Sequence, residues 1–369
     1  MTPAAHPVRR PDGGSGAQPV RVLIVDDSVV ARAVLGRMVA SDPHFLVVGE
    51  AAGAHDALAA LRRAPVDIVL LDVEMPGTSG LAVLPELLRE GRGARVLIVS
   101  SIAADGAAAT VEALQLGAAD TLPKPGGGRM TGTFSSQLLA KMHAIGRAPS
   151  RGTVAALPSA SARHVARNLR AWTEAPLTCL AIGASTGGLH AIAALFAALP
   201  PRIGVPILLT QHLPTVFMPF FARQLELASG REALVAKPGM ALAPDRILLA
   251  PGDAHLVLRR GRGGPVVALE TGPTAAGCLP SVDPMLAAAG EYFGAGALGI
   301  VLTGMGRDGT EGARSLVGHG GSVLVQDAAS ATVWGMPRAI AEAGLASDVL
   351  DPKGIARRIV ERIGSAGRL

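Results

Sequence analysis

The sequence predicts two α/β domains in tandem, each built on a mainly parallel β-sheet. Short apolar runs alternate with helical stretches in each half, and a segment rich in Arg, Ser, Ala and Pro separates the halves. A chain of 369 residues also exceeds the usual size of one domain. We therefore expect a disordered tail (1–19), a first domain (20–146), a basic flexible linker (147–176) and a second domain (177–369).

Composition limits the class of protein. Hydrophobic residues make up 49% of the chain and charged residues 17%, as in a protein with large buried cores. No apolar run is long enough to predict membrane insertion, and the tail lacks the apolar segment of a signal peptide. The two cysteines, Cys179 and Cys278, match no disulfide framework or metal-ligand spacing. We expect a cytoplasmic protein with reduced thiols.

The positive charge is concentrated between the domains. The formal net charge is +5, and residues 126–176 alone hold seven basic residues and one acidic residue, Glu174. This distribution argues against a nucleic-acid partner, because neither folded domain carries the excess. The segment could dock an acidic partner, but a solvated tether is the favoured interpretation.

The first domain alternates strand-like and helix-like stretches. Its expected strands are Val20–Val25, Phe45–Val48, Ile68–Leu71, Val96–Val99 and Asp120–Leu122. Its expected helices are Ser28–Val39, Ala54–Arg63, Leu81–Arg89, Gly106–Leu116 and Phe134–Ile145. This order is typical of a doubly wound parallel sheet, in which ligands bind beyond the carboxyl ends of the strands.

Polar residues follow four of these strands. Asp26 and Asp27 follow the first strand and Asp72 the third, whereas Ser100 follows the fourth and Lys124 the fifth. Three neighbouring carboxylates repel one another unless a cation lies between them, so they predict an oxygen-ligand site of the Mg²⁺ type. A hydroxyl and an ammonium group beside it would complete a phosphate site.

This domain resembles the response-regulator receivers, which have a flavodoxin-like fold. The resemblance implies that Asp72 accepts a phosphoryl group and that Ser100 and Lys124 contact it. It also implies a Mg²⁺ site made by Asp26, Asp27, Asp72 and the backbone carbonyl of Glu74, and a cis peptide at Lys124–Pro125. The sequence departs from the family at 77–80, which lacks the usual Met-Asp, and at Thr121, where many receivers have an aromatic residue.

In the second domain, an apolar run that begins at Leu180 leads into a serine flanked by glycines. Ser185 lies between Gly183 and Gly187-Gly188, and a helix is expected over Leu189–Leu199. Such a strand–turn–helix suits either a nucleophilic serine or a phosphate-binding loop. The second alternative is weaker, because the segment lacks the Lys-Ser/Thr ending of a P-loop and the Gly-x-Gly-x-x-Gly spacing.

Further strands are expected after this turn. Three are buried parallel runs: Val205–Gln211, Ala297–Leu302 and Ser322–Gln326. Three are shorter and suggest a hairpin excursion: Arg246–Ala250, Leu256–Arg259 and Val266–Glu270.

A histidine and an aspartate occupy positions equivalent to that of the serine. His212 follows one buried strand, and Asp308 lies shortly after another. A nucleophile, its base and an orienting carboxylate should meet at such an edge. The order Ser185…His212…Asp308 differs from the Ser…Asp…His order of α/β-hydrolases. His190, His255 and His319 are weaker candidates because none of them ends a buried strand.

The second domain resembles the chemotaxis protein-glutamate methylesterases. The resemblance rests on five motifs: Ile182–Gly188, Gln211–Pro214, Pro280–Asp283, Leu302–Gly309 and Gly335–Pro337. It implies the catalytic triad Ser185, His212 and Asp308, with oxyanion donors near Thr186 and Met305. It also implies glutaminase activity, hydrolysis without a cofactor, chemoreceptors as substrates, and a chemotaxis histidine kinase as phosphodonor.

One departure from this family lies near the expected cleft. Cys278-Leu279 replaces the usual His-Arg, so recognition of an acidic substrate is expected to change. Two other functions stay open at this stage. The receiver could control a non-catalytic scaffold, which would not react with a fluorophosphonate probe. A DNA-binding regulator, with salt-sensitive affinity, is the weakest alternative.

Overall fold

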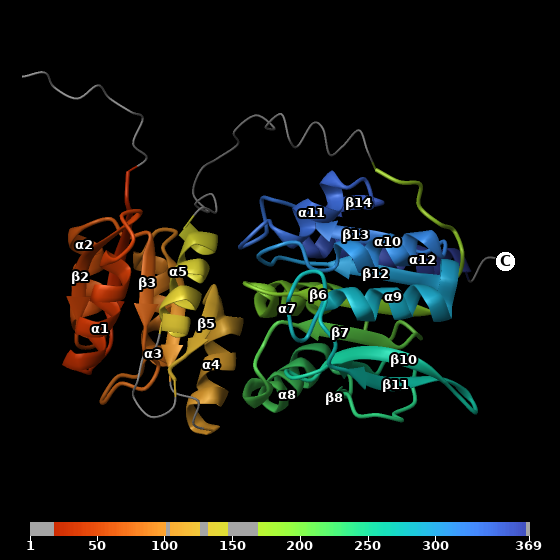
Figure 1. The fold of residues 1–369 in the computed structure, drawn as a ribbon, viewed down its shortest axis with the longest axis horizontal. Coiled ribbons are helices and arrows are strands. Elements are labelled where there is room, and N and C mark those ends of the chain that lie inside the picture. Colours follow the sequence, from red (N-terminus) through yellow and green to blue (C-terminus); the bar gives the residue numbers. More distant parts are fainter. Residues whose placement is uncertain (1–17, 101–103, 126–131, 147–168, 367–369) are drawn as a thin grey trace, which may run out of the picture.

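The computed structural model describes residues 18–100, 104–125, 132–146 and 169–366. Residues 1–17 of the expected tail and 147–168 of the expected linker lie outside the described residues. Figure 1 shows two α/β bodies side by side, the first in red to yellow and the second in green to blue. In these ranges no helix has both the length and the apolar character needed to cross a bilayer.

The first body is a five-stranded parallel sheet in the order β2-β1-β3-β4-β5. Its strands are β1 (Val20–Val25), β2 (Phe45–Ala51), β3 (Ile68–Leu71), β4 (Arg95–Ser100) and β5 (Asp120–Pro123). Its helices are α1 (Val29–Ala40), α2 (Ala54–Arg63), α3 (Gly80–Glu90), α4 (Ala104–Leu116) and α5 (Gly132–Gly146). The doubly wound fold class predicted from the sequence is therefore confirmed.

The second body has a seven-stranded parallel sheet in the order β14-β13-β12-β6-β7-β9-β8. Its strands are β6 (Cys179–Ala184), β7 (Ile207–Gln211), β8 (Ala233–Val235), β9 (Ile247–Leu249), β12 (Ala297–Val301), β13 (Ser322–Gln326) and β14 (Asp348–Leu350). The strands β10 (His255–Gly261) and β11 (Gly264–Glu270) form a separate antiparallel hairpin. Of the three short strands expected from the sequence, β9 joins the main sheet and two make the hairpin.

Helices cover both faces of the second sheet. They are α7 (Gly188–Ala198), α8 (Met218–Ser229), α9 (Val282–Phe293), α10 (Thr310–Gly318), α11 (Met336–Glu342) and α12 (Pro352–Ala366). Strand β6 lies between β7, which follows it in the chain, and β12, which comes much later. The direction of winding changes here, and such a switch point is where open α/β sheets bind ligands.

The two bodies pack through the β5 edge of the first. Strand β5 and helix α4 face the second body in Figure 1. One cluster of buried apolar side chains runs across the junction and includes Leu114 and Ala118 of the first body and Leu189 and Leu213 of the second. Burying this apolar surface stabilises the contact between the domains.

Candidate active site

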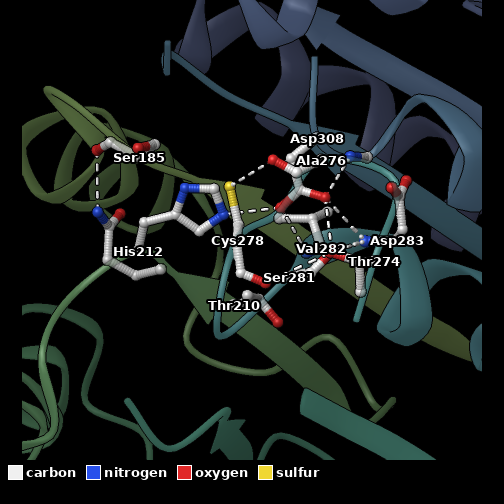
Figure 2. Close-up of polar contacts among 12 residues, drawn as sticks. Ser185, Thr210, His212, Thr274, Ala276, Cys278, Ser281, Val282, Asp283 and Asp308 are labelled. Carbon is white, nitrogen blue, oxygen red and sulfur yellow. Dashed lines mark hydrogen bonds and ion pairs between the residues drawn. The ribbon is translucent and has the colours of Figure 1, made fainter. Parts of the chain in front are cut away.

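The backbone around Ser185 is held from both sides. Its N–H donates to the carbonyl of Thr303 (3.0 Å), which follows β12. Its carbonyl accepts from Nε2 of Gln211, at the end of β7 (2.9 Å; Figure 2). Gly187, next in the turn, has φ 77° and would place a Cβ 2.3 Å from Oγ1 of Thr332. Only glycine fits this turn, which aims the serine beyond the sheet.

His212 lies between the serine and the aspartate. Its N–H donates to the carbonyl of Ala184 (3.1 Å), so the histidine and Ser185 follow neighbouring positions of two paired strands. Its Nε2 lies 2.7 Å from Oδ2 of Asp308. Figure 2 shows Ser185 on the other side of the imidazole. Because Nε2 carries the proton donated to the carboxylate, Nδ1 is the basic nitrogen on the serine side.

The serine hydroxyl and the imidazole do not touch directly. Both residues are described, and no hydrogen bond joins the Ser185 hydroxyl to His212. Such bonds are often long or poorly aligned in unliganded hydrolases and tighten with substrate. The structure thus joins His212 and Asp308 by direct contact, and it puts Ser185 on the adjacent strand end.

Asp308 is buried and accepts hydrogen bonds at both oxygens. Besides His212, its donors are the hydroxyl of Ser281 (2.7 Å) and the N–H groups of Val282 (2.8 Å), Gly309 (2.9 Å) and Asp283 (3.4 Å). Burial alone would raise the pKa of Asp308, but the hydrogen bond and charge of His212 outweigh it and, with the other donors, lower that pKa. The carboxylate therefore stays ionised and fixed in orientation.

Two backbone N–H groups near Ser185 are available as donors. Within the described residues, no hydrogen bond is made by the N–H of Thr186 or by that of Met305. Gly304 approaches the serine closely, since a Cβ there would lie 2.8 Å from the Ser185 Cβ. The expected oxyanion donors therefore come from two turns that meet at Ser185.

Two residues that position Asp308 were not identified from the sequence. The hydroxyl of Ser281 bonds the carboxylate, and its N–H donates to Nδ1 of His255 (2.9 Å). His255 is 2% exposed, and its Nε2 donates to the carbonyl of Gly272 (2.8 Å). Ser281 also caps α9, and it lies in the Pro280–Asp283 motif, so the sequence carried two signals at this position.

The departure from the family at Cys278-Leu279 lies at the site itself. The sulfur of Cys278 lies within 4.8 Å of ligand atoms of both His212 and Asp308 (Figure 2). Burial, followed by the charges of Asp308 and Asp283, raises the pKa of this thiol to about 11. The side chain of Leu279 is 49% exposed. Leu279 therefore places an exposed apolar residue next to Cys278.

The acidic residues at the strand ends of the first body converge as expected. Asp26, Asp27 and Asp72 bring carboxylate oxygens within 4.8 Å of one another. Nζ of Lys124 donates to Asp26 (2.8 Å) and Asp72 (2.5 Å), and the Glu74 N–H donates to Asp72 (3.0 Å). Burial raises the pKa of Asp72 against the opposing effect of Lys124. Burial would lower the pKa of Lys124, but its two carboxylate partners raise it.

This oxygen-rich set with one ammonium group fits a Mg²⁺ ion and a phosphoryl group. Ser100 is fully buried, and its hydroxyl is hydrogen-bonded to Thr110 of α4 (2.7 Å). The expected cis peptide at Lys124–Pro125 is wrong. The cis bond of the described residues is Leu279–Pro280.

A contact between the domains lies directly beside Ser185. The hydroxyl of Thr186 donates to Oδ2 of Asp120 on β5 (2.5 Å), and the Gly187 N–H donates to the carbonyl of Ala119 (2.7 Å). Asp120 also accepts from Nζ of Lys141 on α5 (2.6 Å). No local pattern in the sequence marked Asp120, because its partners come from distant segments.

The first body leaves little room beside Ser185. A crevice at the junction is lined by Leu114, Ala118 and Asp120 on one side and by Ser185, Gly187 and Leu213 on the other. Its free volume is ≈ 10 Å³, about enough for one water molecule. This crevice has no room for a larger group while the domains remain in this arrangement.

Comparisons with known proteins agree with this description. Residues 180–359 match the CheB methylesterase model, and residues 22–130 match the response regulator receiver domain model. A protein-glutamate methylesterase/protein-glutamine glutaminase of Rhodopseudomonas palustris (strain HaA2) is 38% identical, over 93% of this chain and 94% of the relative. A relative of the same name from Azospirillum brasilense is 36% identical, over 96% and 95% of the two chains.

Among solved structures, the catalytic domain of the Thermotoga maritima CheB methylesterase is 32% identical. It covers 50% of this chain and 98% of its own, with a TM-score of 0.49. The sequence matches extend through both domains and include the motifs that carry the site described above. The chain belongs to the CheB methylesterase family, in which a receiver domain precedes the catalytic domain.

Proposed function

We propose that Ser185, His212 and Asp308 hydrolyse glutamate methyl esters and glutamine amides on chemoreceptors, under the control of phosphorylation at Asp72. The observation that carries the proposal is the 2.7 Å contact between Nε2 of His212 and Asp308, with Ser185 on the Nδ1 side. The names of the relatives support this enzyme, active in chemotactic adaptation, over a non-catalytic scaffold. Chemoreceptor substrates and a histidine kinase as phosphodonor imply a cytoplasmic location.

Hydrolysis proceeds in two stages. Nδ1 of His212 takes the proton from the Ser185 hydroxyl, whose oxygen attacks the side-chain carbonyl of the substrate. Asp308 stabilises the imidazolium that forms, and the imidazolium then gives its proton to the departing methanol or ammonia. Water, activated by the same imidazole, releases the product as glutamate and restores Ser185.

The N–H groups of Thr186 and Met305 would bind the oxyanion of each tetrahedral intermediate. In hydrolases of this type, one such donor lowers the barrier by about 3–4 kcal/mol. The triad and these donors supply all the groups that the chemistry requires, so we propose that hydrolysis uses no metal or cofactor.

A direct test follows the substrate rather than the enzyme. Methylated receptor fragments are incubated with the protein and a phosphodonor, and mass spectrometry follows the conversion of glutamate methyl esters and glutamines to glutamate. Methanol and ammonia are measured in parallel. The proposal fails if receptor masses do not change while Asp72 is demonstrably phosphorylated.

The receiver domain controls hydrolysis through phosphorylation of Asp72. Receiver domains generally bind Mg²⁺ for phosphorylation, and here Asp26, Asp27, Asp72 and the Glu74 carbonyl would hold the ion. The ion supplies charge neutralisation for phosphoryl transfer. Lys124 already contacts Asp72 and is positioned to pair with the phosphoryl group that this carboxylate would carry.

Ser100 and Lys124, the two residues expected to contact the phosphoryl group, are each linked to an element at the junction with the catalytic domain. Ser100 is hydrogen-bonded to Thr110 on α4, the helix that also carries Leu114 into the crevice. Lys124 directly follows β5, the strand that carries Asp120 to Thr186. Movement of Ser100 and Lys124 towards a phosphoryl group would therefore disturb the two elements that cover Ser185.

Replacing Leu114 with aspartate should raise the unphosphorylated hydrolysis rate by about tenfold or more. The new charge would be buried between the domains at a position now only 4% exposed. A shift of about 1.4 kcal/mol in the docking equilibrium is sufficient for a tenfold effect. The measurement is the initial rate of methanol release without phosphodonor.

Leu46→Asp is the matched control, because Leu46 is 50% exposed on β2, at the opposite edge of the receiver sheet. This variant should keep the low basal rate. In Asp72→Asn, the phosphodonor should no longer stimulate hydrolysis. Equal basal rates in Leu114→Asp and the wild type would show that the junction does not restrain the enzyme.

A further inference from the structure

Three side chains of different chemistry meet at the edge of the catalytic site. They are the imidazole of His212, the thiol of Cys278 and the carboxylate of Asp308, and one ligand atom of each lies within 4.8 Å of the other two. We propose that these three side chains form an inhibitory binding site for a thiophilic divalent cation, with Zn²⁺ as the best fit. Sulfur, imidazole nitrogen and carboxylate oxygen are the three donor types that zinc uses in proteins.

The observed spacing is close to what a tetrahedral cation requires. Zinc bonds of about 2.0–2.3 Å imply separations of about 3.3–3.6 Å between neighbouring ligand atoms. Nε2 of His212 and Oδ2 of Asp308 are now 2.7 Å apart, so these two would separate slightly. The sulfur would move inward from a loop whose residues around Cys278 are largely exposed. With three protein ligands, a fourth position stays open for water.

The supporting contacts around Asp308 survive in the bound form. Oδ1 keeps the hydroxyl of Ser281 and the N–H of Gly309, so the carboxylate remains anchored. Cys278 donates only a weak hydrogen bond, to the carbonyl of Ala276 at 3.7 Å. The thiol therefore gives up little when it turns towards the cation. Hydrogen-bonded carboxylate ligands are typical of metal sites.

Binding requires two proton movements and no redox step. The S–H bond of Cys278 breaks, a sulfur–metal bond forms and the proton goes to solvent. The Nε2 proton of His212 is replaced by the cation, so the neutral imidazole must carry its proton on Nδ1. Nδ1 is the nitrogen that has to accept the Ser185 proton, so the bound cation blocks hydrolysis. The inhibition rests on the proposed function of His212, whereas the binding does not.

Cobalt(II) tests the binding without relying on activity. Full-length protein is reduced, saturated with Mg²⁺ to occupy the acidic receiver site, and titrated with Co²⁺. A thiolate ligand gives a charge-transfer absorption in the near ultraviolet, which carboxylate and histidine sites lack. We expect this band in the wild type and in Cys179→Ser, whose buried thiol is remote from His212, and its loss in Cys278→Ser.

Zinc then tests whether the bound cation inhibits the reaction at Ser185. Competition with a chromophoric chelator should show at least about tenfold weaker zinc binding in Cys278→Ser than in the wild type. Zinc should slow fluorophosphonate labelling of Ser185 in the wild type and in Cys179→Ser, but much less in Cys278→Ser. A wild-type protein without the cobalt band, or a band that persists in Cys278→Ser, overturns the site. Equal zinc inhibition of both proteins overturns its inhibitory role.

Discussion

Replacement of Ser185 by alanine is expected to lower methanol release from methylated receptors by about 10⁴- to 10⁶-fold. The hydroxyl is the proposed nucleophile, and Figure 2 shows Ser185 on the side of the His212 imidazole opposite Asp308. Losses of this size are typical when a serine hydrolase loses its nucleophile, because the acyl-enzyme can no longer form. The measurement is single-turnover hydrolysis with the phosphodonor present.

The receiver provides the internal control for this variant. Ser185→Ala should accept a phosphoryl group at Asp72 as the wild type does, because the two sites are in different domains. It should also lose fluorophosphonate labelling. If the variant still takes up phosphate and its hydrolysis rate is within tenfold of the wild-type rate, another residue must be the nucleophile.

The site could be anticipated because its residues follow strands that are easy to recognise. β6 and β12 are runs of apolar residues and glycine, β7 is apolar over its first three residues, and each strand leads into a polar residue or turn. Parallel strands end at one edge of a sheet, so Ser185, His212 and Asp308 were expected to meet there. The same argument, applied to β1, β3 and β5, brought Asp26, Asp72 and Lys124 together.

Local patterns could not supply the strand order or the smallest strands. β8 and β14 have three residues each, too few for a period to show. That β6 lies between β7 and β12 depends on packing across more than a hundred residues of chain. The bounds of α2 were predicted to the residue, because its amphipathic stretch defines both ends.

The sequence also did not predict the residues that connect one part of the site to another. Asp120 looks like an ordinary strand residue, yet it joins Lys141 and Thr186 across the domain boundary. No pattern in the sequence indicated a positioning role for His255, yet it positions Ser281 and, through Ser281, Asp308. Such roles depend on tertiary contacts, and neither spacing nor composition encodes them.

Asp308→Asn is expected to reduce hydrolysis by about 10⁴-fold. An asparagine cannot accept at both side-chain positions, whereas Asp308 accepts from His212 and Val282 at one oxygen and from Ser281 and Gly309 at the other. Whichever way the amide turns, an NH₂ group meets a backbone N–H. When the NH₂ group faces Nε2 of His212, it donates to that nitrogen and favours the wrong tautomer, with the imidazole proton on Nδ1.

The same conflict should destabilise the domain, by about 1–3 kcal/mol for a buried donor left unpaired. Asp283→Asn separates this cost from the catalytic loss. Asp283 accepts from the Gly312 N–H (2.8 Å) at one oxygen, and it does not contact the imidazole. Burial, reinforced by the charge of Asp308, raises its pKa, so a neutral amide is a mild change there.

We expect Asp283→Asn to keep hydrolysis within about tenfold of the wild type, with thermal unfolding measured for both variants. If both variants lost activity equally, the loss would reflect packing around α9, and Asp308 would not be the orienting carboxylate. If Asp308→Asn alone failed while its fold persisted, the loss would lie in the pairing of the imidazole with an ionised partner. The proposed mechanism requires that second outcome, because only an ionised acceptor at Nε2 keeps Nδ1 free for the proton of Ser185.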